Sequence, residues 1–398
     1  MKAEKILSHF MVLGILLPGQ PNMRSNFSFI LILLLIPFSA FTQSDSSVTR
    51  IEKTNSIYQT ALYHSDNVYA ISESGHVVIW NLSKLDTIPF PHNDTASYKF
   101  LCVAKDRKNV IYFGTDKGHI FKYSPENRIW SLDRKLKYSV RHVVFNSDNH
   151  PLVIVPYAVY DPITKRRWTK FENHTDGLIR KKKVLGLFSK QIHKYFQMPQ
   201  YTFLDSQDRL WMTASFGEFG GDVQIFDAKN FRIMDNEFDS ISPGLFFPKS
   251  VFEGPDLKIF ITSGLQHFAN SGDIYRMNSD GSTTKVFHSS GLRVLDRTTK
   301  KVIDEGGLFV GPGAYNKRDE CIYFATSRGI HKIKSNQNMS EDAELVVNPA
   351  LSWDREPLAI GVAMNIKRME FLPDGRLLFV TAMDGIGILD RGKLTLFQ

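Results

Sequence analysis

The histidines, which proteins use most often for acid–base chemistry and metal binding, occur singly along this chain. Neither the G-x-S-x-G motif of serine hydrolases nor the H-E-x-x-H motif of zinc proteases is present. Spacing therefore assigns no catalytic residue, metal site or cofactor, and we expect none. The histidines considered are His64, His76, His119, His142, His193, His267, His288 and His331.

The chain contains two cysteines, Cys102 and Cys321, and no cysteine cluster that suggests a metal site. Two cysteines can pair in an oxidising compartment. The repeat described next places these two in well-separated units, so we expect two thiols rather than a disulfide.

The chain after Asp45 repeats one phrase seven times. Short runs rich in Val, Ile, Phe and Tyr alternate with Gly, Asp, Asn and Ser, which is typical of an all-β protein of short strands. In each copy a first strand ends at a polar turn, a second strand ends near a glycine, and a third and a shorter fourth strand follow. The clearest copy is "LDSQDRLWMTASFG", from Leu204 to Gly217. The copies begin at Ala61, Leu101, His142, Tyr201, Ser250, Phe309 and Arg368.

A four-stranded antiparallel unit of this size cannot bury both of its faces alone, whereas units stacked around an axis can. We therefore predict an all-β protein that forms a β-propeller of seven four-stranded blades. The apolar residues of "RLWMTA" should fill the space between blades, and a glycine should let the chain reverse between the second and third strands. These glycines are Gly75, Gly118, Gly221, Gly272, Gly329 and Gly385.

The phrases "LDSQDRLWMTASFG" and "FLPDGRLLFVTAMDG" resemble the repeat of the two-component-regulator propeller family. The resemblance extends weakly from about Ser56 to Phe397, and only the seventh copy has "DG" in its first turn. It implies a periplasmic sensor-type propeller that binds a ligand or a protein, here stand-alone and without a kinase. The best-matching residues are Asp205, Leu210, Trp211, Thr213, Asp374, Gly375 and Thr381.

Two adjacent copies have long loops between their second and third strands, at Ser215–Gly221 and Ser263–Gly272. In a propeller these loops lie on the same face as the connections between blades, where ligands commonly bind. They also hold the one acid–base pair on adjacent blades, Glu218 with His267; packing of the loops against each other is the alternative. The predicted ligand-binding residues are Phe216, Glu218, Phe219, Gln266, His267, Phe268 and Asn270.

The segment 164–200, between copies three and four, is basic and partly apolar. We expect a short amphipathic helix within Leu178–Phe196 that docks an acidic partner, an anionic polymer or a membrane surface; a solvated loop is the alternative. Its docking residues would be Lys165, Arg166, Arg167, Arg180, Lys181, Lys182 and Lys183.

The N-terminal part reads as an export signal. Phe27–Phe38 is an uncharged apolar run preceded by Arg24 and followed by polar residues, and it is too short to span a membrane. We expect residues 1–43 to comprise an over-extended start and a signal peptide, with translation from Met23. Residues 44–398 would then form a single propeller, exported to the periplasm or secreted.

The chain has 398 residues and a net charge of +8, which favours acidic partners without naming one. Nucleic acid is excluded as a partner by the expected export. The sequence favours a monomeric, non-catalytic binding module that recognises a ligand or an envelope protein through one loop-rich face. The alternative is a secreted hydrolase or lyase that acts on a polysaccharide or a lactone.

Overall fold

The computed structural model groups the chain into two units, Met1–Ser46 and Ser47–Gln398, and everything described here belongs to the second. The structure describes residues 48–90, 97–169, 180–184, 188–192, 198–215, 220–234, 247–266, 270–278, 282–289, 292–295, 302–305, 307–340, 342–355 and 363–398.

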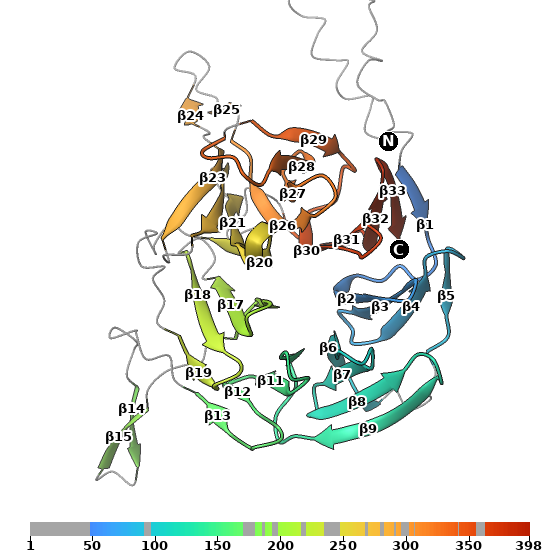
Figure 1. Ribbon diagram of the computed structural model, residues 1–398, viewed down its shortest axis with the longest axis vertical. Coiled ribbons are helices and arrows are strands. Elements are labelled where there is room, and N and C mark those ends of the chain that lie inside the picture. Colours follow the sequence, from blue (N-terminus) through green and yellow to red (C-terminus); the bar gives the residue numbers. More distant parts are fainter. Residues whose placement is uncertain are drawn as a thin grey trace, which may run out of the picture. The chain divides into compact units, whose positions relative to one another are not determined.

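The second unit is a seven-bladed β-propeller, as the repeat predicts. Each blade is an antiparallel four-stranded sheet in chain order, and Figure 1 shows the sheets arranged around one axis. Blades 1 to 3 comprise β2 (Tyr58–His64), β3 (Asn67–Ser72), β4 (Val77–Asn81) and β5 (Asp86–Ile88); β6 (Phe100–Lys105), β7 (Ile111–Thr115), β8 (His119–Ser124) and β9 (Ile129–Lys135); and β10 (His142–Phe145), β11 (Pro151–Val155), β12 (Ala158–Tyr160) and β13 (Arg167–Trp168).

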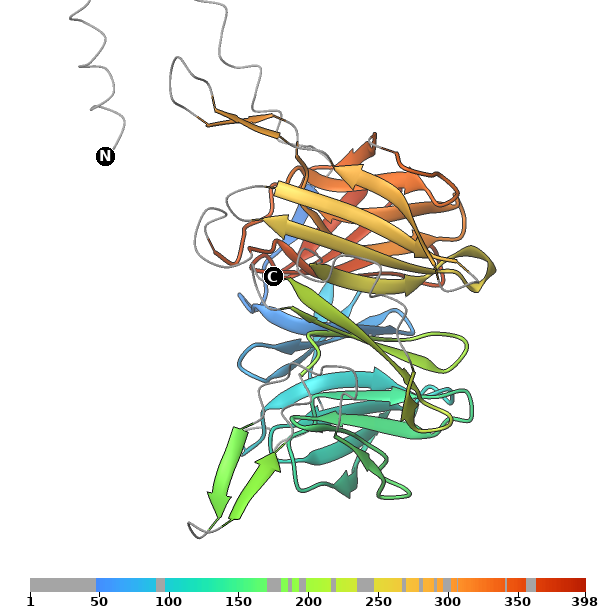
Figure 2. The ribbon, with the colours of Figure 1, turned by 90° about the vertical axis from the view of Figure 1, so that its left-hand side faces the viewer.

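The remaining blades follow around the ring in chain order (Figure 1), and Figure 2 shows the propeller from the side. Blades 4 to 7 comprise β16 (Tyr201–Leu204), β17 (Arg209–Ser215), β18 (Gly221–Asp227) and β19 (Arg232–Ile233); β20 (Pro248–Glu253), β21 (Ile259–Gln266), β22 (Asn270–Met277) and β23 (Thr283–Ser289); β26 (Val310–Asn316), β27 (Cys321–Thr326), β28 (Gly329–Lys334) and β29 (Glu344–Val347); and β30 (Ile366–Phe371), β31 (Leu377–Thr381), β32 (Ile386–Asp390) and β33 (Lys393–Phe397).

The ends of the propeller chain meet in blade 7. Strand β1 (Val48–Ile51) pairs in parallel with β33, so that Val48 lies opposite Leu394. The Gln398 amide donates to the Ile51 carbonyl at 2.8 Å, and the Lys53 amide donates to the Gln398 carbonyl at 2.7 Å. The first residues of the propeller thus cover the outer edge of its last blade and close the ring (Figure 1).

The buried apolar residues form seven clusters among the described residues, and each cluster joins two neighbouring blades. Within the "RLWMTA" phrase, Leu210 and Met212 pack against blade 3. Trp211, on the opposite side of the same strand, packs against blade 5. This confirms that the apolar positions of the repeat fill the space between blades.

The glycines of the repeat serve two purposes. Gly75, Gly118, Gly329 and Gly385 have positive φ and make the predicted reversal between second and third strands. Gly272 instead lies within β22, where a side chain would collide with Val310 of blade 6. Blade 4 likewise has its glycine, Gly221, inside a strand, so in these two blades the glycine permits close packing rather than reversal.

An Asp or Asn fixes the polar turn between first and second strands. Asp205 Oδ1 accepts the amides of Gln207 (3.0 Å) and Arg209 (2.8 Å). Its Oδ2 accepts Arg209 Nε at 2.6 Å and the Trp211 indole at 2.9 Å. Asp106 and Asn146 each accept two turn amides in the same way. In blade 4, four donors would lack an acceptor without this carboxylate. The polar residue recurs in the repeat because the turn amides of each of these blades need such an acceptor.

The prediction of a helix within Leu178–Phe196 is wrong. The chain there forms a hairpin of β14 (Arg180–Val184) and β15 (Phe188–Ile192), in which Val184 lies opposite Phe188. The helical expectation rested on apolar spacing, but Gly186 falls midway between the two strands and favours a turn over a helix interior. A second hairpin, β24 (Leu292–Leu295) with β25 (Val302–Glu305), also lies outside the blades.

The two cysteines lie on β6 and β27, in blades 2 and 6, and both are free buried thiols. The glycine-rich first strand of blade 6 has a β-bulge between Val310 and Gly313. Within the ranges given above, no helix is long and apolar enough to span a membrane.

We predict that replacing Asp205 with alanine lowers the free energy of unfolding by about 3 kcal/mol, because buried donors lose their acceptor. Chemical denaturation of the two proteins measures this difference. Asp205→Asn, which retains one acceptor oxygen, should lose distinctly less. An unchanged denaturation midpoint in the alanine variant would show that the turn does not depend on this carboxylate.

Candidate functional site

The loop residues predicted to bind a ligand are described only in part. Phe216, Glu218, Phe219, His267 and Phe268 lie outside the described residues, so their role stays a prediction. Gln266 ends β21 and Asn270 begins β22, which places both at the tip of a hairpin that is longer than expected. Gln266 is buried, and its Oε1 has no hydrogen-bond partner among the described residues.

The basic residues predicted to dock a partner fall into two groups. Lys165, Arg166 and Arg167 belong to blade 3, in the turn before β13 and in β13 itself. Arg166 stacks over the Phe231 ring of blade 4, at 4.7 Å from its centroid, and so helps to join two blades. Arg180, Lys181, Lys182 and Lys183 lie on β14, and their side chains are outside the described part. Partner docking through these residues stays a prediction.

The central channel forms a cavity with a volume of about 1230 Å³. Its wall is built mainly from the first strands of the blades: β2, β6, β10, β16, β20, β26 and β30 all contribute residues. The start of each first strand lies at the end of the blade that carries the turn between second and third strands; Tyr201, for example, pairs with Thr213. This end of the channel is on the face of the predicted binding loops.

Five of the seven first strands carry a β-bulge at this end of the channel. A bulge inserts one residue without a partner and changes the direction of a side chain, and bulges are common beside binding sites. The inserted residues in blades 1, 2, 5 and 7 are Gln59, Leu101, Lys249 and Lys367, and all four line the channel.

Two inserted residues join their blade to the next one around the ring. Gln59 of blade 1 donates its Nε2 to the Phe100 carbonyl of blade 2 at 3.0 Å. Lys367 of blade 7 donates its Nζ to the Tyr58 carbonyl of blade 1 at 3.0 Å and pairs with Glu73 at 2.8 Å. The polar groups of these two residues are therefore used for structure.

Lys249, the inserted residue of blade 5, differs from them. It is 8% exposed, and its ammonium lies over the Phe309 ring at 5.9 Å from the centroid. Burial lowers the pKa of Lys249 to about 8, against the opposing influence of Asp354. Within the part of the chain that the structure describes, no hydrogen-bond acceptor contacts this amine.

The channel is lined by more positive than negative charge. Its wall contains eight Lys or Arg residues against four Asp or Glu residues. Two of the four acids are used locally, since Asp205 binds Arg209 and Glu253 accepts the Ser206 hydroxyl at 2.6 Å. Positive charge in a low-dielectric concavity attracts anions.

Arg368 on β30 is the most exceptional of these cations. Its Nε is buried and has no hydrogen-bond partner among the described residues, while its Nη2 lies 3.4 Å from Glu370 Oε2. Burial lowers the pKa of Arg368, but Glu370 and Tyr201 raise it further, so the guanidinium stays charged. The Arg368 side chain is 35% exposed, so its charged guanidinium can bind a carboxylate or a similar anion that enters the channel.

His142 and Tyr201 complete this part of the wall as neutral groups. Burial lowers the pKa of His142 to about 4, aided by the positive charge of Arg368. The imidazole of His142 donates a hydrogen bond to the Pro199 carbonyl, and its Nδ1 lies 3.4 Å from the Thr202 hydroxyl. Burial also raises the pKa of Tyr201, which remains a protonated phenol. At neutral pH His142 therefore has little capacity as a general base.

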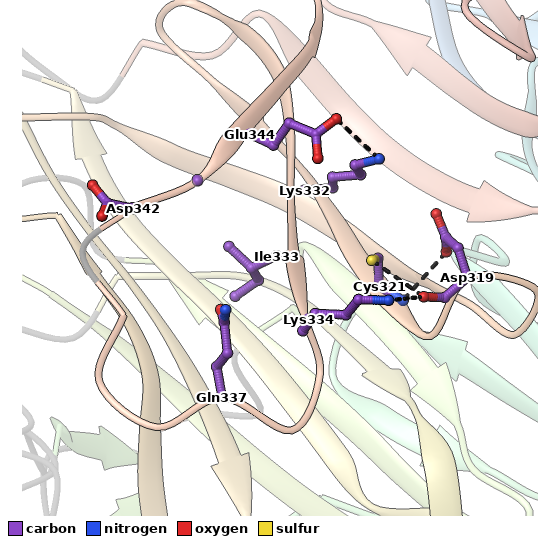
Figure 3. Close-up of a pocket in the computed structure, with 9 residues that line it drawn as sticks. Asp319, Cys321, Lys332, Ile333, Lys334, Gln337, Asp342 and Glu344 are labelled. Atoms are coloured by element: carbon purple, nitrogen blue, oxygen red, sulfur yellow. Dashed lines mark hydrogen bonds and ion pairs between the residues drawn. The ribbon is translucent and has the colours of Figure 1, made fainter.

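A second cavity, of about 430 Å³, lies on β27, β28 and β29 of blade 6. Figure 3 shows Lys332 directed at Glu344 and Lys334 directed at Asp319. Lys332 pairs with Glu344 at 3.1 Å, and Lys334 donates to the Asp319 carbonyl at 2.8 Å. Because these cations already have partners, the channel is the stronger candidate site.

Sequence reasoning missed the channel residues because each blade contributes only a few of them. Lys249, Arg368 and Glu370 are ordinary polar positions in short strands, and nothing in their spacing sets them apart. The available signal was the start of each first strand, where the propeller fold requires residues to face the axis.

The comparisons with known proteins bear on the fold. Neither a scan of protein-family models nor a search of curated proteins finds a match. A streptogramin B lyase structure is 12% identical over 86% of this chain and 94% of that chain, with a TM-score of 0.51. A catalytically inactive virginiamycin B lyase from Staphylococcus aureus with quinupristin is 13% identical over 85% and 97%, with a TM-score of 0.50.

The similar structures also include the extracellular domain of a hybrid two-component system from B. thetaiotaomicron. It is 12% identical, with 75% of this chain and 32% of that chain covered and a TM-score of 0.44. At these identities the similarity shows the shared propeller fold alone and says nothing about activity.

We predict that the protein loses stability as the pH falls from about 6.5 to about 4. His142 takes up a proton in the unfolded chain below its ordinary pKa of 6.5, whereas the folded protein resists protonation down to about 4. Thermal melting across this pH range measures the effect. In a His142→Gln variant this contribution should be absent, and an identical pH profile in both proteins would contradict the assignment.

Proposed function

We propose that the protein is a binding module whose central channel takes an anionic ligand at the end that faces the blade connections. The observation that supports this most directly is Arg368, a charged guanidinium in the channel wall whose side chain is 35% exposed. The surplus of cations around it strengthens attraction for an anion, and the predicted loop residues would cover the ligand from the same face. The binding is non-catalytic.

The chemistry of His142 does not suit a general base. A hydrolase or lyase needs a group that accepts a proton near neutral pH. His142 is the histidine that lines the channel among the described residues, and its depressed pKa and its contact with Pro199 suit a wall residue. Arg368 and Tyr201 bind and orient rather than accept protons.

We further propose that the protein is exported through a cleaved signal peptide and acts in the periplasm or outside the cell. The apolar run Phe27–Phe38 supports this, as does the resemblance of the repeat to periplasmic sensor propellers. A propeller that takes up an anion there would pass the event on through contact with an envelope protein.

The central test is Arg368→Met, which removes the charge and keeps a similar length. We predict that binding of oligogalacturonate, an acidic oligosaccharide, weakens about 10- to 100-fold, as expected for loss of a charge-assisted hydrogen bond. Titration calorimetry measures the affinity, with a neutral galacto-oligosaccharide as the uncharged ligand. Arg391→Met is the matched control, since Arg391 is exposed on the turn after β32. Equal affinity of both variants for the acidic ligand would refute the assignment.

The loop prediction has its own test. Replacing Phe216, Phe219, His267 and Phe268 together with alanine should reduce ligand affinity at least tenfold. The melting temperature should stay nearly unchanged, because we expect residues of a binding loop to face the ligand rather than the core between blades. Full affinity in this variant, combined with loss in Arg368→Met, would confine the site to the channel.

A further inference from the structure

We infer that Lys249 forms a reversible imine with a carbonyl group of the ligand that enters the channel. The substrate class is an aldehyde or ketone that also carries a carboxylate. The carboxylate part of this inference rests on the proposed function, whereas the reactivity of the amine does not.

The position of Lys249 is the first argument. It is the inserted residue of the β20 bulge, between Pro248 and Ser250, and it lines the channel. Its counterparts Gln59 and Lys367 donate to the carbonyls of the following blade. The ammonium of Lys249 lies over the ring of Phe309 instead, so here the bulge leaves the amine without a carbonyl acceptor from the next blade.

The surroundings of Lys249 are the second argument. The side chain is 8% exposed, and Phe309 itself packs edge-on against Trp353, 5.7 Å between ring centroids. Desolvation of most of the side chain is costly for an ammonium, and a methionine would fill such an apolar space without that cost. Desolvation in an apolar pocket is also how proteins turn a lysine into a nucleophile.

The reaction needs no oxidant, reductant or metal. The lone pair of Nζ forms a bond to the carbonyl carbon while the C=O electrons move to oxygen. Nitrogen then gives up its two protons as the oxygen leaves as water, and a C=N bond remains. With its pKa lowered to about 8, a substantial fraction of the amine is unprotonated near neutral pH. Addition of water to the C=N bond reverses each step.

The test uses the intact protein with glyoxylate, an aldehyde that carries a carboxylate, and cyanoborohydride, which reduces an imine to a stable secondary amine. Peptide mapping by mass spectrometry reports which lysines acquire a carboxymethyl group. We expect Lys249 to react at least tenfold faster than Lys367, which is paired in the same channel, and than exposed Lys84. Reaction spread evenly over the exposed lysines, with Lys249 unmodified, would overturn the inference.

Two further measurements separate this inference from the proposed function. Lys249→Arg keeps the positive charge but has no primary amine, so it should give no trapped adduct at residue 249, while labelling of exposed Lys84 should not change. Acetaldehyde lacks a carboxylate, so it should label Lys249 more slowly than glyoxylate does, and Arg368→Met should abolish that difference. Equal labelling by both aldehydes in the wild-type protein would support the reactive amine and refute the anion site.

Discussion

The fold depends on one constraint: a blade of this protein cannot bury its own two faces. Each buried cluster is therefore shared between two neighbours, and a single strand such as β17 directs Leu210 and Met212 to one blade and Trp211 to the other. Because every blade needs a neighbour on each side, this arrangement buries all its apolar faces only when the ring is closed. Closure places the first and last blades in contact, where Tyr58 and Trp80 pack with Phe397. The pairing of β1 with β33 then secures the joint.

The same constraint creates the channel. Once the outer faces of the sheets are used for packing between blades, the first strands are left around the axis with one edge unpaired. The β-bulges at their starts insert residues that line this space. Because the wall combines seven strands from distant parts of the chain, cations as far apart in sequence as Arg141 and Arg368 share one cavity.

The architecture could be predicted from the sequence because alternating apolar residues and polar turns recur at the period of a blade. The resemblance to the two-component-regulator propeller repeat is weak for a physical reason. Its turn glycine corresponds to a left-handed backbone position, which Asn109, Asn149 and Asp208 occupy here with φ near 60°. Only blade 7 keeps glycine, Gly375. The hairpin β14–β15 was missed because its apolar spacing also fits a helix, and the channel was missed because no local pattern records which strands converge.

Within the channel, the residues that we propose for ligand binding are those whose polar groups do not join one blade to the next. Gln59 and Lys367 show what an inserted residue does when a carbonyl of the next blade lies within reach: it joins the two blades and its polar group is satisfied. Lys249 meets an aromatic ring instead, and Arg368 keeps a free Nε beside a single carboxylate. A ring that needed these residues only for stability would be better served by apolar side chains. Lys249 and Arg368 are thus best understood as cations available to a partner from outside the chain.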